Sequence, residues 1–452
     1  MSPSFLSFDF SLPRTLIVLA GVGMLMCLDL SARVRHQRTR YGLGVVIGTI
    51  LAFGLLKVTQ MIMSPELPKQ GETIALGVFL IVVTWRLLFG NWDSRTKATV
   101  LGTFVFWIFY HMLSGEDPAT RTAHLIAIGT AIIPAIIWCL LFLPYHKERL
   151  SIVFTMVFAG MLSTIPILFY DSLVHTGAEL HFFLFRIAPE SFSANARLFV
   201  SGYWPGIAPL QSSLLSMFLS FILVGVIEEG SKLWILWRSG RQYSASIDDV
   251  MQMAVLVAIG FAFAENVTSS GYFLGFVRQY LLTPGQQDWG SFLGNVAGRS
   301  ILTSMVHIAS TGIMGYYVGL GLFAGPILKE QHAAGIRYRI FEWIHDVLGI
   351  PKRDLYRRMK ILTGFAIAIF LHALSDFLVS LPDALPGNPR TVGDLLHSSP
   401  GSPFNFVALL LLPTLLYVVG GFSLLTYLFQ RKENMKERGH LVEMEEMIGE
   451  EG

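Results

Sequence analysis

Long apolar runs recur along the whole chain, and they decide what it can fold into. Runs of about 17 or more mostly apolar residues occupy 15–31, 42–63, 73–90, 98–114, 122–144, 151–170, 208–236, 249–274, 292–323, 361–381 and 404–429. A run of this length is long enough to cross a bilayer as an α-helix. Only 14% of the residues are charged, whereas soluble domains carry about 25%. The sequence therefore predicts an all-α polytopic membrane protein with about eleven transmembrane helices.

Basic residues indicate how these helices are oriented. If the N-terminus lies outside, the inside loops hold most of the Lys and Arg residues, including those at 33–40, 329–360 and 431–438. The positive-inside rule then places the C-terminus in the cytoplasm. We expect the chain to lie in the inner membrane of the cell. Only Arg14 precedes the first apolar run, so we expect this run to remain as an anchor rather than be cleaved as a signal peptide.

Charge and cysteine content exclude several classes of partner and site. The net charge of +2 gives no indication of a nucleic-acid partner. The two cysteines, Cys27 and Cys139, lie far apart in apolar runs. This placement predicts neither a disulfide framework nor a cysteine metal pair.

The segment Gly335–Ile350 has the pattern of an amphipathic helix. Its apolar residues fall at helical spacing, and they are Ile336, Ile340, Ile344, Val347 and Leu348. Charged residues take the other face, and Pro351 ends the segment. The pattern is typical of a helix that lies on the inner membrane surface, and equally of a linker helix packed on the bundle.

The apolar runs between 208 and 381 carry acids and histidines, where a membrane helix should carry none. A charged group at the centre of a membrane helix costs roughly 2.5–3.5 kcal/mol, so such groups indicate a functional site that faces a bundle interior. Glu228 and Lys232 are four residues apart and share one helix face. Glu229 is about 100° further round, so both carboxylates can border one cavity. A carboxylate pair with a lysine counter-ion is suited to activating a water molecule, although an ion pair at the helix end would have the same pattern.

Three further motifs follow along the chain. Glu265 and Asn266 lie midway in the eighth run, and His307 lies in the ninth. Each of these residues alone also fits a structural hydrogen bond between helices. His372 and Asp376 are more specific, because their i, i+4 spacing lets the carboxylate orient the imidazole.

Together, these motifs resemble those of the PrsW-type intramembrane proteases, which are related to the CAAX prenyl proteases and the bacteriocin-processing proteins. The resemblance covers about 208–428. It rests on Glu228-Glu229-x-x-Lys232, Phe261-x-x-x-Glu265-Asn266, His307 before Ala309-Ser310-Thr311-Gly312, and His372-x-x-x-Asp376, with Arg299 eight residues before His307 and Asp248-Asp249 at the start of the eighth helix. The first six helices have no counterpart in it, and the basic loop 325–360 is longer than the family core requires.

The resemblance implies peptide-bond hydrolysis inside the membrane, on a membrane-anchored protein such as an anti-sigma-like regulator. Carried over, Glu228 and Glu229 would activate the water, and Asp376 would orient His372. Glu265, His307 and His372 would bind the water, the oxyanion or a metal, with Lys232, Asn266 and Arg299 in support. The implied organisation is an N-terminal membrane domain over 1–205, a protease core that forms a C-terminal catalytic bundle over 206–430, and a charged cytoplasmic tail over 431–452.

The cofactor is either absent or one divalent metal ion such as zinc. The candidate metal ligands are Glu265, His307 and His372, since two histidines and a carboxylate can form a zinc site. The chain contains no His-Glu-x-x-His motif. We therefore expect that no metal is tightly held.

A proton- or cation-coupled transporter is the main alternative, because it also needs intramembrane carboxylates and histidines. Transporters of this kind have repeats and helices broken by Gly or Pro at the site. The runs from 208 to 381 show no such pairing. The sequence therefore favours the protease.

Overall fold

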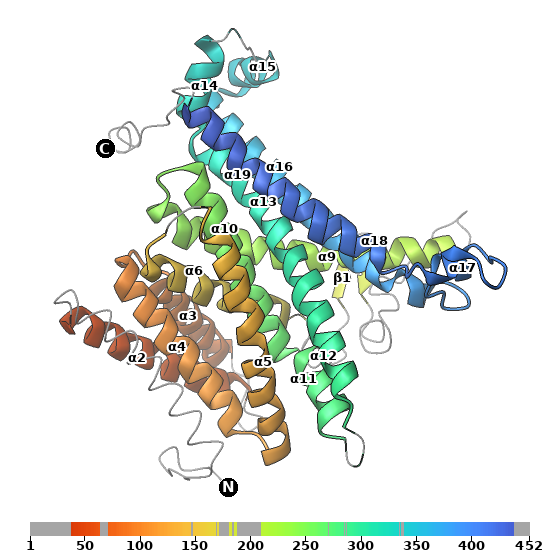
Figure 1. Cartoon of the computed structure of the whole chain (residues 1–452). Coiled ribbons are helices and arrows are strands. Elements are labelled where there is room, and N and C mark those ends of the chain that lie inside the picture. The colour runs from red at the N-terminus through yellow and green to blue at the C-terminus, as the bar shows by residue number, and fades with distance from the viewer. Residues whose placement is uncertain are drawn as a thin grey trace.

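Helices occupy every predicted apolar run from residue 42 onward (Figure 1). The computed structural model describes residues 38–63, 71–145, 148–168, 170, 180–182, 185–187, 209–269, 271–283, 285, 287–333, 335 and 339–437. The predicted run at 15–31 lies outside the described residues. The described part of the chain confirms the all-α membrane class.

The elements follow one another in simple order. The first half contains α2 (Arg38–Met63), α3 (Gly71–Leu88), α4 (Ser94–Ser114), α5 (Pro118–Phe142), α6 (Leu150–Leu162) and an antiparallel pair of short strands, β1 (Leu180–Phe182) and β2 (Phe185–Ile187). The second half contains α9 (Pro209–Ile235), α10 (Ile247–Thr268), α11 (Phe273–Phe276), α12 (Trp289–Gly298), α13 (Ser304–Leu322), α14 (Ala324–Ala333), α15 (Arg339–Leu348), α16 (Lys352–Ala384), α17 (Val392–Leu395), α18 (Leu411–Thr414) and α19 (Phe422–Glu437). Short π-helical turns extend or join several of these helices, namely η1 (Leu236–Gly240), η3 (Val277–Leu281), η4 (Arg299–Thr303) and η6 (Leu415–Gly421), and the short helices η2 (Arg241–Tyr243) and η5 (Pro403–Phe406) are 3₁₀ turns.

The predicted count of eleven spans is not confirmed. Among the described residues, eight helices are long and apolar enough to cross a membrane. Helices α3 and α4 form where predicted but are not among these eight. The ninth predicted run is long because it comprises α12, the π-helical turn η4 and α13.

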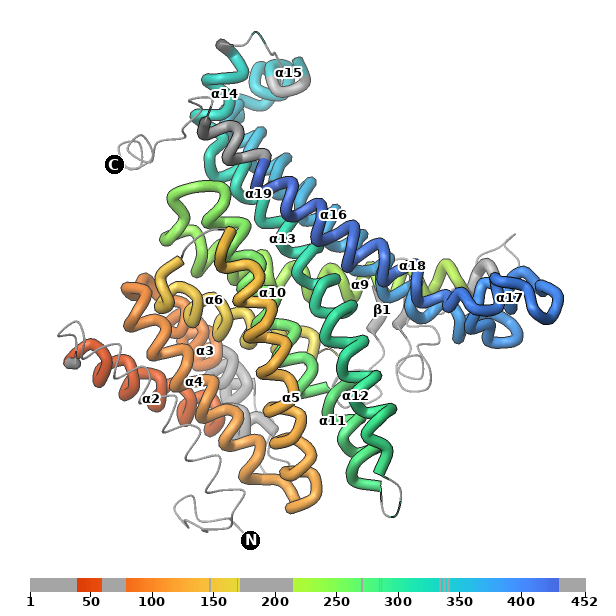
Figure 2. The backbone as a smooth tube through the Cα atoms, in the orientation of Figure 1, coloured from red at the N-terminus to blue at the C-terminus, as the bar shows by residue number. Residues whose placement is uncertain are grey.

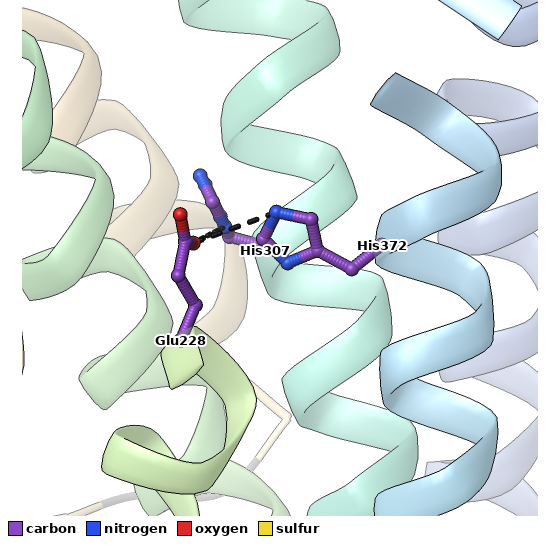
Figure 3. A group of neighbouring side chains, drawn as sticks. All are labelled: Glu228, His307 and His372. Carbon is purple, nitrogen blue, oxygen red and sulfur yellow. Dashed lines mark ion pairs between the residues drawn. The ribbon is translucent and has the colours of Figure 1, made fainter. Parts of the chain in front are cut away.

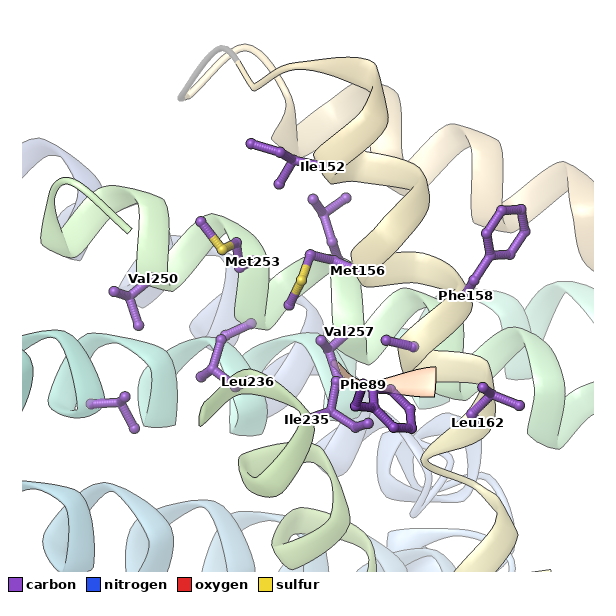
Figure 4. Packing of buried hydrophobic residues seen from close by; sticks show 14 of the residues in the cluster. Phe89, Ile152, Met156, Phe158, Leu162, Ile235, Leu236, Val250, Met253 and Val257 are labelled. Atoms are coloured by element: carbon purple, nitrogen blue, oxygen red, sulfur yellow. The ribbon is translucent and has the colours of Figure 1, made fainter. Parts of the chain in front are cut away.

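Helix α10 forms the centre of the bundle, and its most apolar window is entirely buried. It begins at a capping box in which the Ser246 side chain accepts from the Asp249 backbone, while the Asp249 side chain binds the Ser246 backbone. This arrangement satisfies backbone donors that a helix start would otherwise leave unpaired. Asp248 and Asp249 therefore open the eighth helix, as expected. Figure 4 shows how Met156 of α6 packs beside Met253 and Val257 of α10.

The helices with the predicted site residues are neighbours in space. Helix α10 packs on α13, α13 packs on α16, and α16 packs on α9. Figure 2 shows α13 and α16 running side by side. More than thirty residues separate the end of α13 from the apolar part of α16. The predicted motifs, which are far apart in the sequence, can therefore meet.

Candidate active site

Four helices bring the predicted site residues together in the interior of the bundle. The side chains of Glu228, His307 and His372 point toward one another, as Figure 3 shows. The contributing helices are α9 with Glu228, Glu229 and Lys232, α10 with Glu265 and Asn266, α13 with His307, and α16 with His372 and Asp376. The structure thus places all of the predicted motifs around one site.

Glu229 is the hydrogen-bonding centre of this group, and it is completely buried. Its Oε1 accepts from Lys232 Nζ at 2.7 Å and contacts His372 Nδ1 at 2.9 Å. Its Oε2 accepts from the Thr311 hydroxyl at 2.9 Å. Both oxygens of this carboxylate are therefore committed to neighbouring side chains from three helices.

Glu228 is arranged differently, although it is the next residue. Its Oε2 is buried and has no hydrogen-bond partner among the described residues. The same oxygen lies 3.4 Å from His372 Nε2 and 3.6 Å from Lys232 Nζ, distances that are long for good hydrogen bonds. A buried carboxylate oxygen without a partner is costly, so it indicates a water or substrate site.

A cavity of about 390 Å³ adjoins Glu228. Its ionisable lining residues are Glu228, Glu265, Arg299, His307, His372 and Asp376. Apolar side chains such as Phe221, Val224 and Val379 line it further along α9 and α16. The volume is large enough for several water molecules and a short peptide segment. Glu229 does not line the cavity, because the 100° step along the helix turns it into the protein interior.

His307 is held on both sides of its ring. Its Nδ1 lies 3.0 Å from Lys232 Nζ and its Nε2 lies 3.1 Å from Glu265 Oε2. Because an ammonium group can only donate, Nδ1 accepts from Lys232, and Nε2 carries the proton that is donated to Glu265. Lys232 is also completely buried and lies over the Phe261 ring at 3.8 Å, so the phenylalanine of the second motif stabilises the same cation.

Glu265 and Asn266 hold Arg299 at the edge of the cavity. Arg299 NH2 lies 3.0 Å from Glu265 Oε2, and Arg299 Nε donates to Asn266 Oδ1 at 2.6 Å. The guanidinium group also stacks on the Tyr272 ring. Arg299 begins η4, where the π-helical turn interrupts the predicted single helix, and such turns are frequent at functional sites.

The expected orientation of His372 by Asp376 differs in the structure. His372 Nδ1 contacts Glu229 at 2.9 Å, whereas its Nε2 is 3.5 Å from Asp376 Oδ2. The stronger partner is therefore Glu229, which comes from another helix and which sequence spacing could not identify. Asp376 lies on the cavity side, where its side chain is 34% exposed.

Two residues of the site received no role from the sequence. Thr311 lies four residues after His307 and thus on the same helix face, a spacing that could have revealed its bond to Glu229. Tyr417 of η6 donates its hydroxyl to the Leu371 carbonyl, next to His372. No local signal links Tyr417 to His372, because they are on different helices.

The structure suggests a different set of metal ligands from the expected Glu265, His307 and His372. The atoms of Glu228, His307 and His372 lie within 4.8 Å of one another and could bind a metal ion; the residue types are those of catalytic zinc sites. The Lys232 ammonium group, however, lies 3.0 Å from His307 Nδ1 and 3.6 Å from Glu228 Oε2. It occupies the lone pair that His307 would offer to a metal, so the set does not fit a metal ion while Lys232 stays in place.

Comparison with known proteins identifies a family that part of the chain resembles. Residues 148–345 match the sequence model of the PrsW family intramembrane metalloprotease. The match begins ahead of α6, earlier than the expected core boundary at 206, and it ends before His372. Curated proteins and solved structures give no significant match. The family match on a bundle of membrane helices confirms the resemblance over residues 148–345, which are similar to the PrsW family of intramembrane metalloproteases, and it identifies the chain as a membrane peptidase.

Proposed function

We propose that this peptidase hydrolyses a peptide bond of a membrane-anchored protein in the cavity beside Glu228, with Glu228 as the base that activates water. The single observation that supports this role is the buried Oε2 of Glu228, which borders the cavity and has no hydrogen-bond partner among the described residues. A general base must lie within reach of the proton that it removes. A water molecule in the cavity would satisfy this orphaned oxygen.

In the proposed reaction, Glu228 transfers the protons and His372 stabilises the oxyanion. Glu228 takes a proton from the water, whose oxygen attacks the scissile carbonyl carbon. His372, which Glu229 holds at Nδ1, directs Nε2 toward Glu228 and Asp376 and, when protonated, stabilises the oxyanion. As the carbon–nitrogen bond breaks, Glu228 passes its proton to the leaving nitrogen, so the products are a new carboxyl group and a new amine.

Glu229 has a supporting role in this proposal. Its two oxygens bind Lys232, His372 and Thr311 and do not face the cavity. It therefore positions His372 and Lys232, and through Lys232 it positions His307. Arg299, Glu265 and Asn266 form a second group that fixes the other side of His307 and lines the cavity edge.

A metal has no step in this mechanism. If Lys232 were displaced, Glu228, His307 and His372 would be the ligands, and the metal would supply Lewis-acid activation of the water. The position of Lys232 beside two of these ligands supports water activation by the carboxylate without a tightly held metal.

The membrane orientation and the substrate class are also part of the proposal. We infer that the N-terminus lies outside and the C-terminus in the cytoplasm of the inner membrane, on the basis of the loop charges. The substrate that the family resemblance favours is a membrane-tethered regulator of the anti-sigma type. The proposed organisation is an N-terminal membrane domain over 1–205, a protease core from 206 and a cytoplasmic tail over 431–452.

The test is a comparison of membrane-protein fragments in cells that produce the wild-type chain or Glu228→Gln. Fragments that depend on activity should appear with the wild type and be absent with Glu228→Gln at equal protein level. Glu342→Gln, which lies in α15 outside the cavity, is the matched control and should give the wild-type pattern. An unchanged set of fragments with Glu228→Gln would overturn the assignment.

A further inference from the structure

Helix α15 presents an uncovered apolar face. Trp343 is 66% exposed, Val347 59% and Leu348 64%. Their spacing of four and five residues places them on one side of the helix. The sequence left open whether the predicted apolar face of this segment packs on the bundle; in the structure its residues Val347 and Leu348 are exposed, as is Trp343, while Ile344 is half-buried.

The connections of α15 hold it at one end of the molecule, beyond the packed membrane helices (Figure 1). The helix ends at Gly349, whose φ of 67° favours glycine. His345 Nδ1 contacts the Ile350 carbonyl at 2.8 Å, and Pro351 caps the start of α16. Because this turn is tied by specific contacts, the apolar face of α15 has a defined direction relative to α16.

Positive charge accompanies this face. Arg339, Lys352 and Arg358 are exposed, and the segment 325–360 contains twice as many Lys and Arg residues as Asp and Glu residues. The ion pair of Lys352 with Glu342 is 3.7 Å long and largely exposed, so it leaves the charge of Lys352 available. An apolar face with a tryptophan beside exposed cations is the pattern of a helix that binds anionic lipid surfaces.

A bilayer explains this face better than a protein partner does. A stable protein interface buries about 800 Å² on each partner, which is more than three side chains of a ten-residue helix supply. By contrast, the candidate membrane spans α13 and α16 flank the connector that contains α15, so a bilayer that holds these spans lies near this helix. Tryptophan is enriched at the membrane interface because its ring is amphipathic.

We propose that α15 lies on the bilayer surface, with Trp343, Val347 and Leu348 inserted between anionic phospholipid headgroups. Helices α14 and α15 connect α13 to α16, and these carry His307 and His372. Docking of α15 thus anchors the connector between the two helices that supply the histidines. This inference does not depend on the proposed catalytic roles.

The test measures the depth of Trp343 in the full-length protein, reconstituted in vesicles whose lipid chains carry bromine, which quenches tryptophan. Subtracting the emission of Trp343→Phe from that of the wild type isolates Trp343 from the eight other tryptophans. We expect at least twofold quenching of this difference signal in vesicles that contain phosphatidylglycerol, and clearly less in vesicles of phosphatidylcholine alone. Aqueous iodide should have little effect on the docked residue.

A matched pair of variants tests the face itself. Val347→Asp should release Trp343 from the lipid and expose it to iodide, whereas Val347→Leu should keep it docked. Val347 is exposed, so neither change should impair folding. A Trp343 signal that iodide quenches and brominated lipid does not would overturn the proposal, and equal quenching in both lipid mixtures would overturn its anionic preference.

Discussion

Separate replacement of Glu228 and Glu229 by glutamine should show that Glu229 is needed for stability, whereas Glu228 is needed for catalysis alone. Glu229 accepts contacts from Lys232, His372 and Thr311 through both oxygens. A glutamine offers one carbonyl oxygen and an amide that can only donate, so Glu229→Gln removes the carboxylate 2.7 Å from the buried Lys232 ammonium and leaves only Glu228, at 3.6 Å. Breaking a buried ion pair in this way costs about 3–5 kcal/mol.

Glu228→Gln should have the opposite effects. Its Oε2 has no hydrogen-bond partner among the described residues, so the free energy of unfolding should change by about 1 kcal/mol or less. Loss of the base should nevertheless lower kcat by roughly 10²- to 10⁴-fold. Glu229→Gln should also be inactive, because His372 and Lys232 lose their positions.

The assay is denaturant unfolding of the purified variants in detergent, run beside cleavage of a validated substrate. Adding Lys232→Met to Glu229→Gln removes the buried cation that has lost its nearest carboxylate, so this double variant should recover stability without recovering activity. The reasoning fails if Glu228→Gln is destabilised as much as Glu229→Gln, since Glu228 would then also be a structural anchor. It fails equally if Glu228→Gln cleaves at the wild-type rate.

Three further outcomes are expected. Elemental analysis of active protein should find no stoichiometric zinc and chelators should leave activity intact, whereas one zinc per chain that is lost in His372→Ala would show that Lys232 yields its place to a metal. A cysteine at Ser398 should react with an impermeant reagent from outside and one at Ala333 should not, and the reverse labelling would contradict the N-outside orientation. Thr311→Val should lower the free energy of unfolding by about 1–3 kcal/mol, because it removes a donor to a buried carboxylate, and it should also lower kcat. Thr311→Ser should retain most of both, and equal behaviour of the two variants would show that the hydroxyl is unimportant.

The helices could be predicted because apolar length and composition determine them. Each apolar run from 42 onward contains helix, yet the predicted count of eleven spans is not confirmed. Helices α3 and α4 were counted on apolar length alone, although neither is among the eight candidate spans. The interruption of the ninth run by η4 was not predicted either, since a π-helical turn has no distinctive composition.

The convergence of the site could be predicted from the cost of buried charge, but the partners within it could not. The i, i+4 rule connects residues of one helix, and it paired His372 with Asp376. The contact of Glu229 with His372 crosses from α9 to α16, so it depends on how the helices pack. The resemblance implied Glu265 as a candidate metal ligand, whereas the structure pairs Glu265 with Arg299, and the group close enough to hold a metal contains Glu228 instead.

The last prediction concerns where the catalytic unit begins. Helix α6 crosses α10 so closely that a Cβ on Gly260 would overlap the Val157 backbone, and one on Gly160 would overlap the Val257 backbone. Gly260→Ala should therefore lower stability by about 1–3 kcal/mol through overpacking, although alanine itself favours a helix. Activity should also fall, because α10 carries Glu265.

The matched control is Gly294→Ala in α12, where an added Cβ meets nothing within 4 Å; it should be neutral or slightly stabilising. Ile167 and Leu168, in the helical segment that follows α6, line the cavity. If α6 is part of the catalytic unit, Gly160→Ala should impair cleavage as Gly260→Ala does, and the unit begins near 148 rather than at 206. Wild-type activity and stability in both α6–α10 variants would instead support the boundary at 206, because the crossing would then be dispensable for the geometry of the site.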